Sequence, residues 1–201
     1  LGPLTSVLSA TAPWSVYADA QAAGTLATSS TAATEITPTT EIPADYSFSL
    51  RKGAETTLTV NKADNFTLVN GSPMSQLQAG DTARKLQPED IDTYYAEYTK
   101  VGRYNNRWLD ARLTVTGYVE GVHAYPEHVG LMSFDRSGIG VHTVGLEQIQ
   151  LKYEFFDSET GALTSVKGNT TYCDIDYAQG VHLISGFEDI FVTSNTWLHI
   201  E

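Results

Sequence analysis

The sequence predicts an all-β protein, built as an antiparallel β-sandwich of the immunoglobulin-like or jelly-roll-like kind. One observation is the strict alternation of polar and apolar side chains over residues 148–155, a period of two that is typical of a half-buried strand. A second is the recurrence of short strand-like runs separated by turn residues. The third is the scarcity of helical patterns, since only residues 87–92, with Pro88 at a permitted first position, resemble a helical turn.

The strand-like runs follow one another from residue 46 to residue 200. They occupy residues 46–50, 56–60, 66–69, 94–99, 112–119, 148–156, 169–175, 181–184, 189–193 and 196–200. Turn-forming residues separate several of them, at Arg51-Lys52-Gly53, Asn70-Gly71, Asn105-Asn106 and 157–161. In the last of these turns, Gly161 supplies the left-handed backbone that a bulged hairpin requires.

The two best alternating runs each have one apolar face and one polar face. The apolar residues are Ile149, Leu151, Tyr153 and Phe155 in one run, and Leu113, Val115 and Val119 in the other. Gly117 interrupts the second row, which predicts a β-bulge or the close approach of another strand. Because the other face of both runs is polar, we expect one sheet face to contact water and to be able to carry a binding surface.

The charge and the cysteine content restrict the partners and the chemistry. The chain contains 24 Asp and Glu against 12 Lys and Arg, a formal net charge of -12. Nucleic acids and anionic membranes attract basic surfaces, so we expect neither as a partner. The single cysteine, Cys173, excludes an internal disulfide and a multi-cysteine zinc site, and its apolar position predicts a small core residue. No stretch approaches the ~18 apolar residues of a membrane span, so membrane insertion of the folded domain is not expected.

The first 44 residues differ in composition from the rest, because no Lys or Arg precedes Arg51 and Ala, Thr, Ser and Pro dominate. The mildly apolar run 4–16, followed by small residues up to 22, is typical of the end of a secretory signal peptide. The alternative is a disordered Thr/Ala-rich leader of other origin. The prediction is a signal-peptide remnant at 1–22, a disordered Ser/Thr/Ala/Pro linker at 23–44 and one β-sandwich domain at 45–201.

Three segments between residues 100 and 200 resemble a known family. They are YNNRWLDARLTVT at 104–116, LKYEFFDSETG at 151–161, and VKG at 166–168 followed by TYCDIDYAQG at 171–180. They are similar to segments of large Gram-positive wall-anchored surface proteins, namely adhesins of the antigen I/II, glucan-binding and aggregation-substance kind, and the DIDxxQG run is the most distinctive. Asn106 stands where those proteins have a glycine.

This resemblance implies a non-enzymatic module that is secreted or attached to the cell wall and acts in adhesion or as a structural spacer. A surface protein or a glycan of the host or of bacteria would be its partner. The alternative is a carbohydrate-binding module or part of a carbohydrate-active enzyme. We expect no catalytic residues and no cofactor, and calcium is the alternative.

Asp174 and Asp176 are the candidate metal ligands. On a strand they would point to the same side, as ligands of a shared calcium ion must, and carboxylate oxygens suit calcium. The loop pattern of an EF-hand is missing. The interpretation that we favour is structural, with one aspartate accepting backbone N–H groups at the corner after the strand.

An intramolecular isopeptide bond is a second hypothesis for a domain without disulfides. The reaction needs a lysine that has lost its proton, an Asn or Asp side chain beside it, and a buried acid that transfers protons. Lys52 or Lys62 together with Asn195 have a suitable order along the chain. The alternative that we favour is that these lysines are solvated, because buried lysines are rare.

Three histidines, His123, His128 and His142, lie between the two best strands, but their spacing matches no common zinc motif, so we expect exposed loop side chains. The segment 135–138 lacks the nucleophile elbow of serine hydrolases. Trp108 and Tyr104 are candidates for a platform that stacks on sugar rings. Further aromatic candidates are Tyr94, Tyr95, Tyr98 and Trp197, and the alternative for all of them is packing in the core or at its rim.

Overall fold

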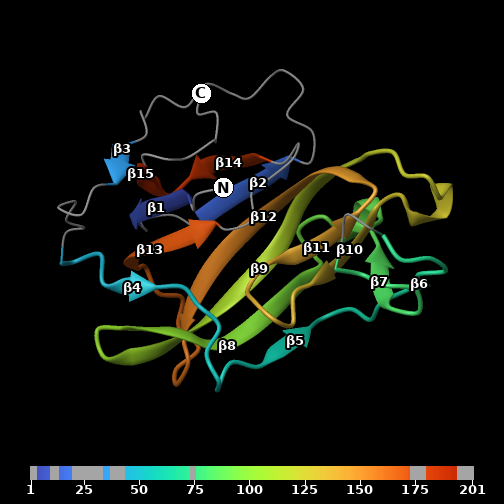
Figure 1. Ribbon diagram of the computed structural model, residues 1–201. Helices are drawn as coiled ribbons and strands as arrows, with labels where there is room; N and C mark the ends of the chain where they lie inside the picture. The colour runs from blue at the N-terminus through green and yellow to red at the C-terminus, as the bar shows by residue number, and fades with distance from the viewer. Residues whose placement is uncertain are drawn as a thin grey trace.

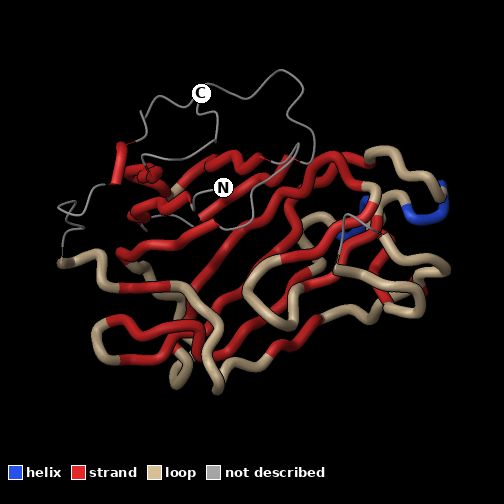
Figure 2. The backbone as a smooth tube through the Cα atoms, in the orientation of Figure 1, coloured by secondary structure: helices blue, strands red, loops and turns tan. Residues whose placement is uncertain are grey.

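The computed structural model describes residues 44–72, 76–172 and 180–193, together with the strands β1 (Leu4–Ser9), β2 (Trp14–Asp19) and β3 (Thr34–Ile36). For β1 to β3 and residues 188–193 it describes the backbone alone. The chain is nearly all β, and its antiparallel sheets pack against each other as a sandwich (Figure 1), which confirms the predicted fold class. Figure 2 shows strands along most of the described trace.

The other strands begin at Phe48. They are β4 (Phe48–Ser49), β5 (Leu58–Val60), β6 (Phe66–Thr67), β7 (Thr82–Lys85), β8 (Tyr95–Tyr104), β9 (Arg107–Glu120), β10 (Leu131–Phe134), β11 (Val141–Val144), β12 (Leu146–Asp157), β13 (Lys167–Tyr172), β14 (Gly180–Ser185) and β15 (Phe187–Thr193). Two short 3₁₀ turns lie between them, η1 (Pro88–Asp90) and η2 (Pro126–His128). The first of these is the helical turn that the sequence predicts.

The strands form three sheets. The six-stranded sheet has the order β14-β2-β12-β9-β8-β5, and its long strands β8, β9 and β12 run diagonally through the molecule in Figure 1. The five-stranded sheet has the order β3-β15-β1-β13-β4, and the four-stranded sheet has the order β11-β10-β7-β6. Side chains from both smaller sheets share one core with the inner face of the six-stranded sheet.

The antiparallel pair β9 and β12 provides most of that inner face. The predicted alternation is borne out, because Ile149, Leu151, Tyr153 and Phe155 are all buried. On β9 the buried residues are Leu109, Ala111, Leu113 and Val115. Gln150 pairs with Gly117 whereas Leu151 pairs with Val115, so the register shifts by one residue and a β-bulge lies beside Gly117, as predicted.

The two smaller sheets contact different parts of this core. Phe48 of β4 packs edge-on against Phe155, with ring centroids 5.0 Å apart. Phe134 of β10 packs against Tyr94, with centroids 5.1 Å apart. The backbone of β4 approaches β13 so closely that a Cβ atom on Gly168 would lie 2.2 Å from the carbonyl oxygen of Phe48. That position therefore requires glycine.

The hairpin that joins β8 to β9 follows its sequence. Tyr104 pairs with Arg107, and the two residues between them, Asn105 and Asn106, have φ angles of 48° and 62°. Two consecutive positive φ angles define the two-residue turn for which asparagine and glycine are favoured. Asparagine adopts this conformation more readily than other residues with a side chain, so Asn106 serves where glycine would be usual.

A bulge in β8 is stabilised by Asp110. Lys100 has a φ angle of 49°, and the register of β8 against β9 shifts between Tyr98 and Gly102. One carboxylate oxygen of Asp110 accepts the Lys100 N–H at 2.8 Å and also the hydroxyl of Ser158. The same side chain therefore joins the bulge to the turn after β12.

Strands also occur where the sequence pattern does not predict them. β7, β10 and β11 are each four residues long and lie in segments without a sustained alternation. β1 and β2 lie within residues 1–22, the stretch interpreted above as a signal-peptide remnant. β1 pairs with β13 and β15, and β2 pairs with β12 and β14. A mildly apolar run suits a signal peptide and a buried strand alike, so its composition does not separate the two.

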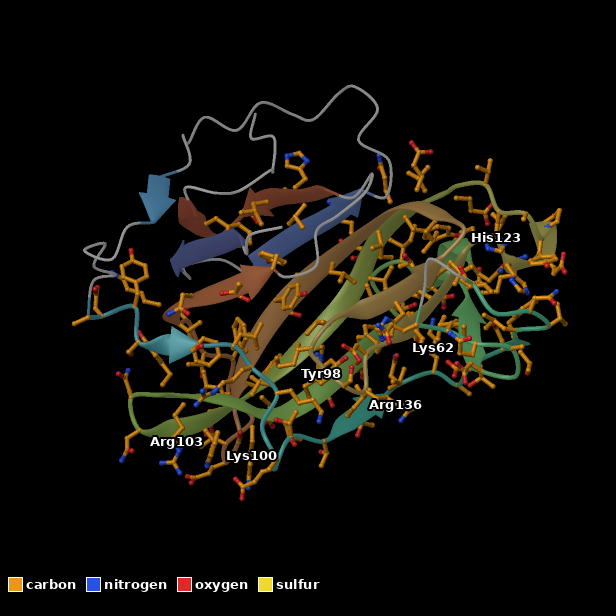
Figure 3. The ribbon with its side chains drawn as sticks, in the orientation of Figure 1. Lys62, Tyr98, Lys100, Arg103, His123 and Arg136 are labelled. Atoms are coloured by element: carbon orange, nitrogen blue, oxygen red, sulfur yellow. The ribbon has the colours of Figure 1, made fainter. Side chains whose placement is uncertain are left out.

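Tyr98 anchors the loop between β10 and β11. Its buried side chain reaches the carbonyl oxygens of Asp135 at 2.8 Å and Gly140 at 3.2 Å (Figure 3). We expect Tyr98→Phe to lower the free energy of unfolding by about 1 kcal/mol, because the Asp135 carbonyl oxygen loses the Tyr98 hydroxyl, whereas the Gly140 oxygen keeps the Asp135 N–H and the ring still packs. Urea unfolding followed by fluorescence measures the change.

Tyr153→Phe is the matched control for this experiment. Tyr153 is also buried, and burial alone raises the pKa of its phenol, whereas a hydrogen bond to the Gly140 backbone also acts on that of Tyr98. We expect this variant to be within about 0.5 kcal/mol of the wild type. Equal effects of the two substitutions would contradict the anchoring role of Tyr98.

Candidate functional site

The outer face of the six-stranded sheet carries a group of aromatic and charged side chains. Successive side chains alternate between the two faces of a strand, so Tyr95, Trp108, Arg112 and Phe156 lie opposite the core side. Phe156 pairs with Asp110, and Tyr95 pairs with Thr114. The three rings therefore lie on three neighbouring strands, each ring half-buried.

Arg112 stacks between two of these rings. Its Cζ atom lies 4.7 Å from the ring centroid of Tyr95 and 4.9 Å from that of Phe156. Its Nε and Nη2 atoms donate to Oε1 of Glu97 at 3.0 and 2.6 Å. The guanidinium thus lies between the two rings, and the carboxylate fixes its orientation on the face.

The predicted platform residues Trp108 and Tyr104 lie on opposite faces of the hairpin. Trp108 pairs with Arg103 on the outer face, and the Cζ atom of Arg103 lies 4.6 Å from the indole ring. Tyr104 points to the core side, where its ring packs edge-on against Phe48 at 6.5 Å. Only Trp108 of this pair is therefore available on the outer face. We name Trp108, Tyr95, Phe156, Arg103 and Arg112 the outer-face cluster.

The other aromatic candidates divide in the same way. Tyr94 and Tyr98 are core residues, and burial raises the pKa of both phenols well above the ordinary value. Tyr95 joins Trp108 on the outer face, and Trp197 lies outside the described residues. Phe156 was not among the candidates, although its neighbour Phe155 was assigned to the core. Adjacent residues of a strand point to opposite faces, so the burial predicted for Phe155 also predicts that Phe156 lies on the outer face.

Lys62 of the isopeptide hypothesis has a carboxylate partner. Its Nζ atom lies 2.8 Å from Oδ1 of Asp90 and donates to the Thr93 hydroxyl at 2.8 Å (Figure 3). Asp90 is fully buried and also accepts two hydrogen bonds from Arg84, at 2.9 and 2.8 Å. Lys52 is exposed, and Asn195 lies outside the described residues.

The environment of Asp90 keeps its carboxyl group ionised. Burial alone would raise the pKa of Asp90, but hydrogen bonds from Arg84, Lys62 and the Gln87 N–H outweigh burial, and the net pKa is lowered. Arg84 donates two charge-assisted bonds to the carboxylate. An ionised carboxylate does not accept attack by an amine, so this arrangement supports an ion pair at Lys62 and not an amide bond.

The candidate calcium ligands Asp174 and Asp176 lie outside the described residues, as does Cys173. Within the described ranges, no three histidine, cysteine, aspartate or glutamate side chains are arranged to hold a metal ion.

Asp157, at the end of β12, has a structural role. It accepts the N–H groups of Glu159 and Thr160 at 3.0 and 2.9 Å, and hydrogen bonding from Thr160 is the main cause of its lowered pKa.

The histidines differ from the expectation of exposed loop side chains. His128 is fully buried, and neither of its ring nitrogens has a hydrogen-bond partner. His123 lies beside it, with ring centroids 5.3 Å apart. The correction has a physical reason, because the loop folds back so that His128 packs edge-on against Phe66 of β6. A contact between residues so distant in the chain leaves no local pattern.

His142 lies near a serine and an aspartate, but the three do not form a nucleophile relay. Oδ1 of Asp135 accepts the Ser137 hydroxyl at 2.7 Å and lies 3.3 Å from Nε2 of His142. In a serine hydrolase the histidine lies between the serine and the acid. Here the acid lies in the middle, so the serine has no base to receive its proton.

Comparisons with known proteins add no relative. The sequence matches no protein-family model and no curated protein, and no solved structure matches the fold. The outer-face cluster, argued from its own geometry, is therefore the candidate functional site.

Asp90→Asn tests the ion cluster. Removing the charge leaves Arg84 and Lys62 without their shared counter-ion, so we expect a loss of about 3 kcal/mol of stability at neutral pH. Because the folded-state pKa of Asp90 is lowered, its contribution is present above the ordinary pKa of about 4 and is lost as the pH falls below it. Urea unfolding across this pH range should therefore show a steeper acid loss in the wild type than in the variant.

Asp45→Asn is the control, because Asp45 forms an exposed ion pair with Lys167 at 3.0 Å. Exposed ion pairs contribute little to stability, so we expect no resolvable change in the urea midpoint. Intact mass spectrometry of the wild type should equal the mass of the sequence. A mass lower by one water, mapped to Lys62 and Asp90, would contradict the ion-pair assignment.

Proposed function

We propose that this chain is a non-enzymatic extracellular module of a bacterial surface protein that acts in adhesion, with the outer-face cluster as its contact surface. The observation that carries the proposal is the group of half-buried rings and arginines on the outer face of β8, β9 and β12. Aromatic residues and arginine are the residue types enriched in interface contacts that contribute most of the binding energy. A structural spacer has no need of such a face.

The arrangement of the cluster suits a contact surface. Arg112 is held by Glu97 and Arg103 lies over the Trp108 ring, so both guanidinium groups are positioned before a partner binds. Side chains that are ordered in advance lose less conformational freedom on binding. The strands beneath them are the longest of those that the structure describes, which gives the face a rigid base.

A carbohydrate-binding module is the second candidate function. Trp108 and Phe156 favour it, because partly exposed rings on a sheet face can stack on the apolar faces of sugar rings. The arginines and Glu97 would supply hydrogen bonds to hydroxyl groups at the same site. The two candidates share the surface and differ in the partner, a glycan in one case and a protein in the other.

Location outside the cell is part of the same proposal. It is supported by the signal-like composition of residues 1–22 and by the resemblance over residues 100–200. Among the described residues, no helix has the length and apolar character needed to cross a membrane.

Trp108→Ala and Phe156→Ala test the contact surface. Removing a central ring should weaken binding about tenfold or more, since truncation of an aromatic anchor commonly costs about 2 kcal/mol. Binding is measured on a glycan array and on intact host cells. Tyr125→Ala is the matched control, because Tyr125 is an exposed aromatic residue outside the cluster.

The outcomes distinguish the candidates. Loss on the array identifies a glycan partner, and loss on cells alone identifies a protein partner. Unchanged binding by both variants, or no binding by the wild type in either assay, would contradict the adhesive role. Hydrolysis of a polysaccharide panel by the wild type would contradict the non-enzymatic assignment.

A further inference from the structure

Loop 121–130, between β9 and β10, is built around a histidine without hydrogen bonds. Of the buried side chains that the structure describes, only His128 has polar atoms that lack any partner, and both ring nitrogens are affected. A neutral imidazole has one donor and one acceptor, and burying both without partners destabilises the folded chain. Such an exception calls for a physical reason.

Three aromatic rings surround His128. The ring lies 5.8 Å from Phe66, 5.4 Å from Tyr125 and 5.3 Å from His123. Apart from these rings, the loop is held by backbone hydrogen bonds. The His128 N–H donates to Tyr125 at 2.9 Å, and the Gly130 N–H donates to Gly145 at 3.0 Å.

His123 also holds the loop in its neutral form. Its Nδ1 atom accepts the Tyr125 N–H at 3.1 Å, and a protonated Nδ1 could not accept this bond. Both histidines therefore favour the closed loop only while they are uncharged. If both gained a proton, two like charges would face each other across 5.3 Å.

The charged groups around the loop offer no compensation. Lys85 of β7 donates its ammonium group to the Glu127 carbonyl oxygen at 3.2 Å, which adds a positive charge on that side. The Glu127 carboxylate is exposed, and Glu120 lies against Gly130. On the side of β6, Asp64 accepts the Thr82 hydroxyl. Neither histidine has an ion pair with a carboxylate of the described residues.

We propose that loop 121–130 is a pH-sensitive latch, closed while His123 and His128 are neutral and opened when they are protonated. Because histidine is the side chain that gains a charge on mild acidification, a fall in pH supplies the signal. Opening would expose Phe66 and the small apolar cluster beneath it, formed by Leu68, Leu77, Ala83, Leu131 and Val144. Figure 3 shows His123 far from Arg103, so the latch is separate from the outer-face cluster.

His142 provides an internal comparison. Its Nε2 atom lies 3.3 Å from the carboxylate of Asp135, so a proton gained there strengthens an ion pair. The same fall in pH should therefore leave the loop at Asp135 closed.

Hydrogen exchange on the full chain tests the latch. At about pH 5, compared with about pH 7.5, the protection of residues 121–130 should fall by up to tenfold per pH unit for each histidine that gains a proton, after division by the intrinsic exchange rate. His128→Phe should reduce the fall, because phenylalanine fills the aromatic site without titrating and only His123 still gains a charge. His123→Asn should reduce it, because the Asn oxygen can still accept the Tyr125 N–H but cannot be protonated in this range.

His142→Asn is the matched control and should retain the full acid effect. Unchanged protection of wild-type residues 121–130 between the two pH values would overturn the proposal. So would an acid effect of the same size in His123→Asn, which remains informative even if His128→Phe fails to fold. Loss of the acid effect in His142→Asn alone would show that His142 carries the pH sensitivity, and this result would also overturn the proposal.

Discussion

The shared inner face of β9 and β12 is the constraint on which the other parts of the structure depend. The two strands pair from Leu109 to Glu120 on one side and from Leu146 to Asp157 on the other, and their alternation supplies one continuous apolar surface. Both smaller sheets bury their side chains against this surface. The same alternation places Arg112, Trp108 and Phe156 on the opposite face, so the core pattern also creates the candidate site.

Much of the fold could be predicted from the sequence because its central strands are long and regular. Alternation over 148–155 located β12, and Asn105-Asn106 located the β8–β9 turn. The four-residue strands β10 and β11 could not be found in this way. Their segment contains several glycines and no sustained period, and they are strands because they pair with each other and with β7. Such pairing is determined by tertiary packing and not by local preference.

The candidate site was predicted in part. Trp108 and Tyr95 were named from the sequence, and alternation would also have supplied Phe156. Tyr104 and Trp108 were both candidates for the platform, but a two-residue turn places residues 104 and 108 on opposite faces. His128 could not be assigned, since its burial depends on Phe66 of another strand. The role of Asp90 likewise depends on Lys62 and Arg84, which only the folded chain brings together.

The close approach of β4 to Gly102 and Gly168 has a consequence for the order of folding. β4 pairs in parallel with β13, at Phe48↔Gly168, although the two strands are far apart in the chain. The β8–β9 hairpin forms from neighbouring residues and can assemble early, whereas closing so long a loop is slow. The β4–β13 pairing is therefore expected to form late. Until it forms, β13 has an unpaired edge on the side of β4, and unpaired strand edges make a partly folded chain prone to aggregate.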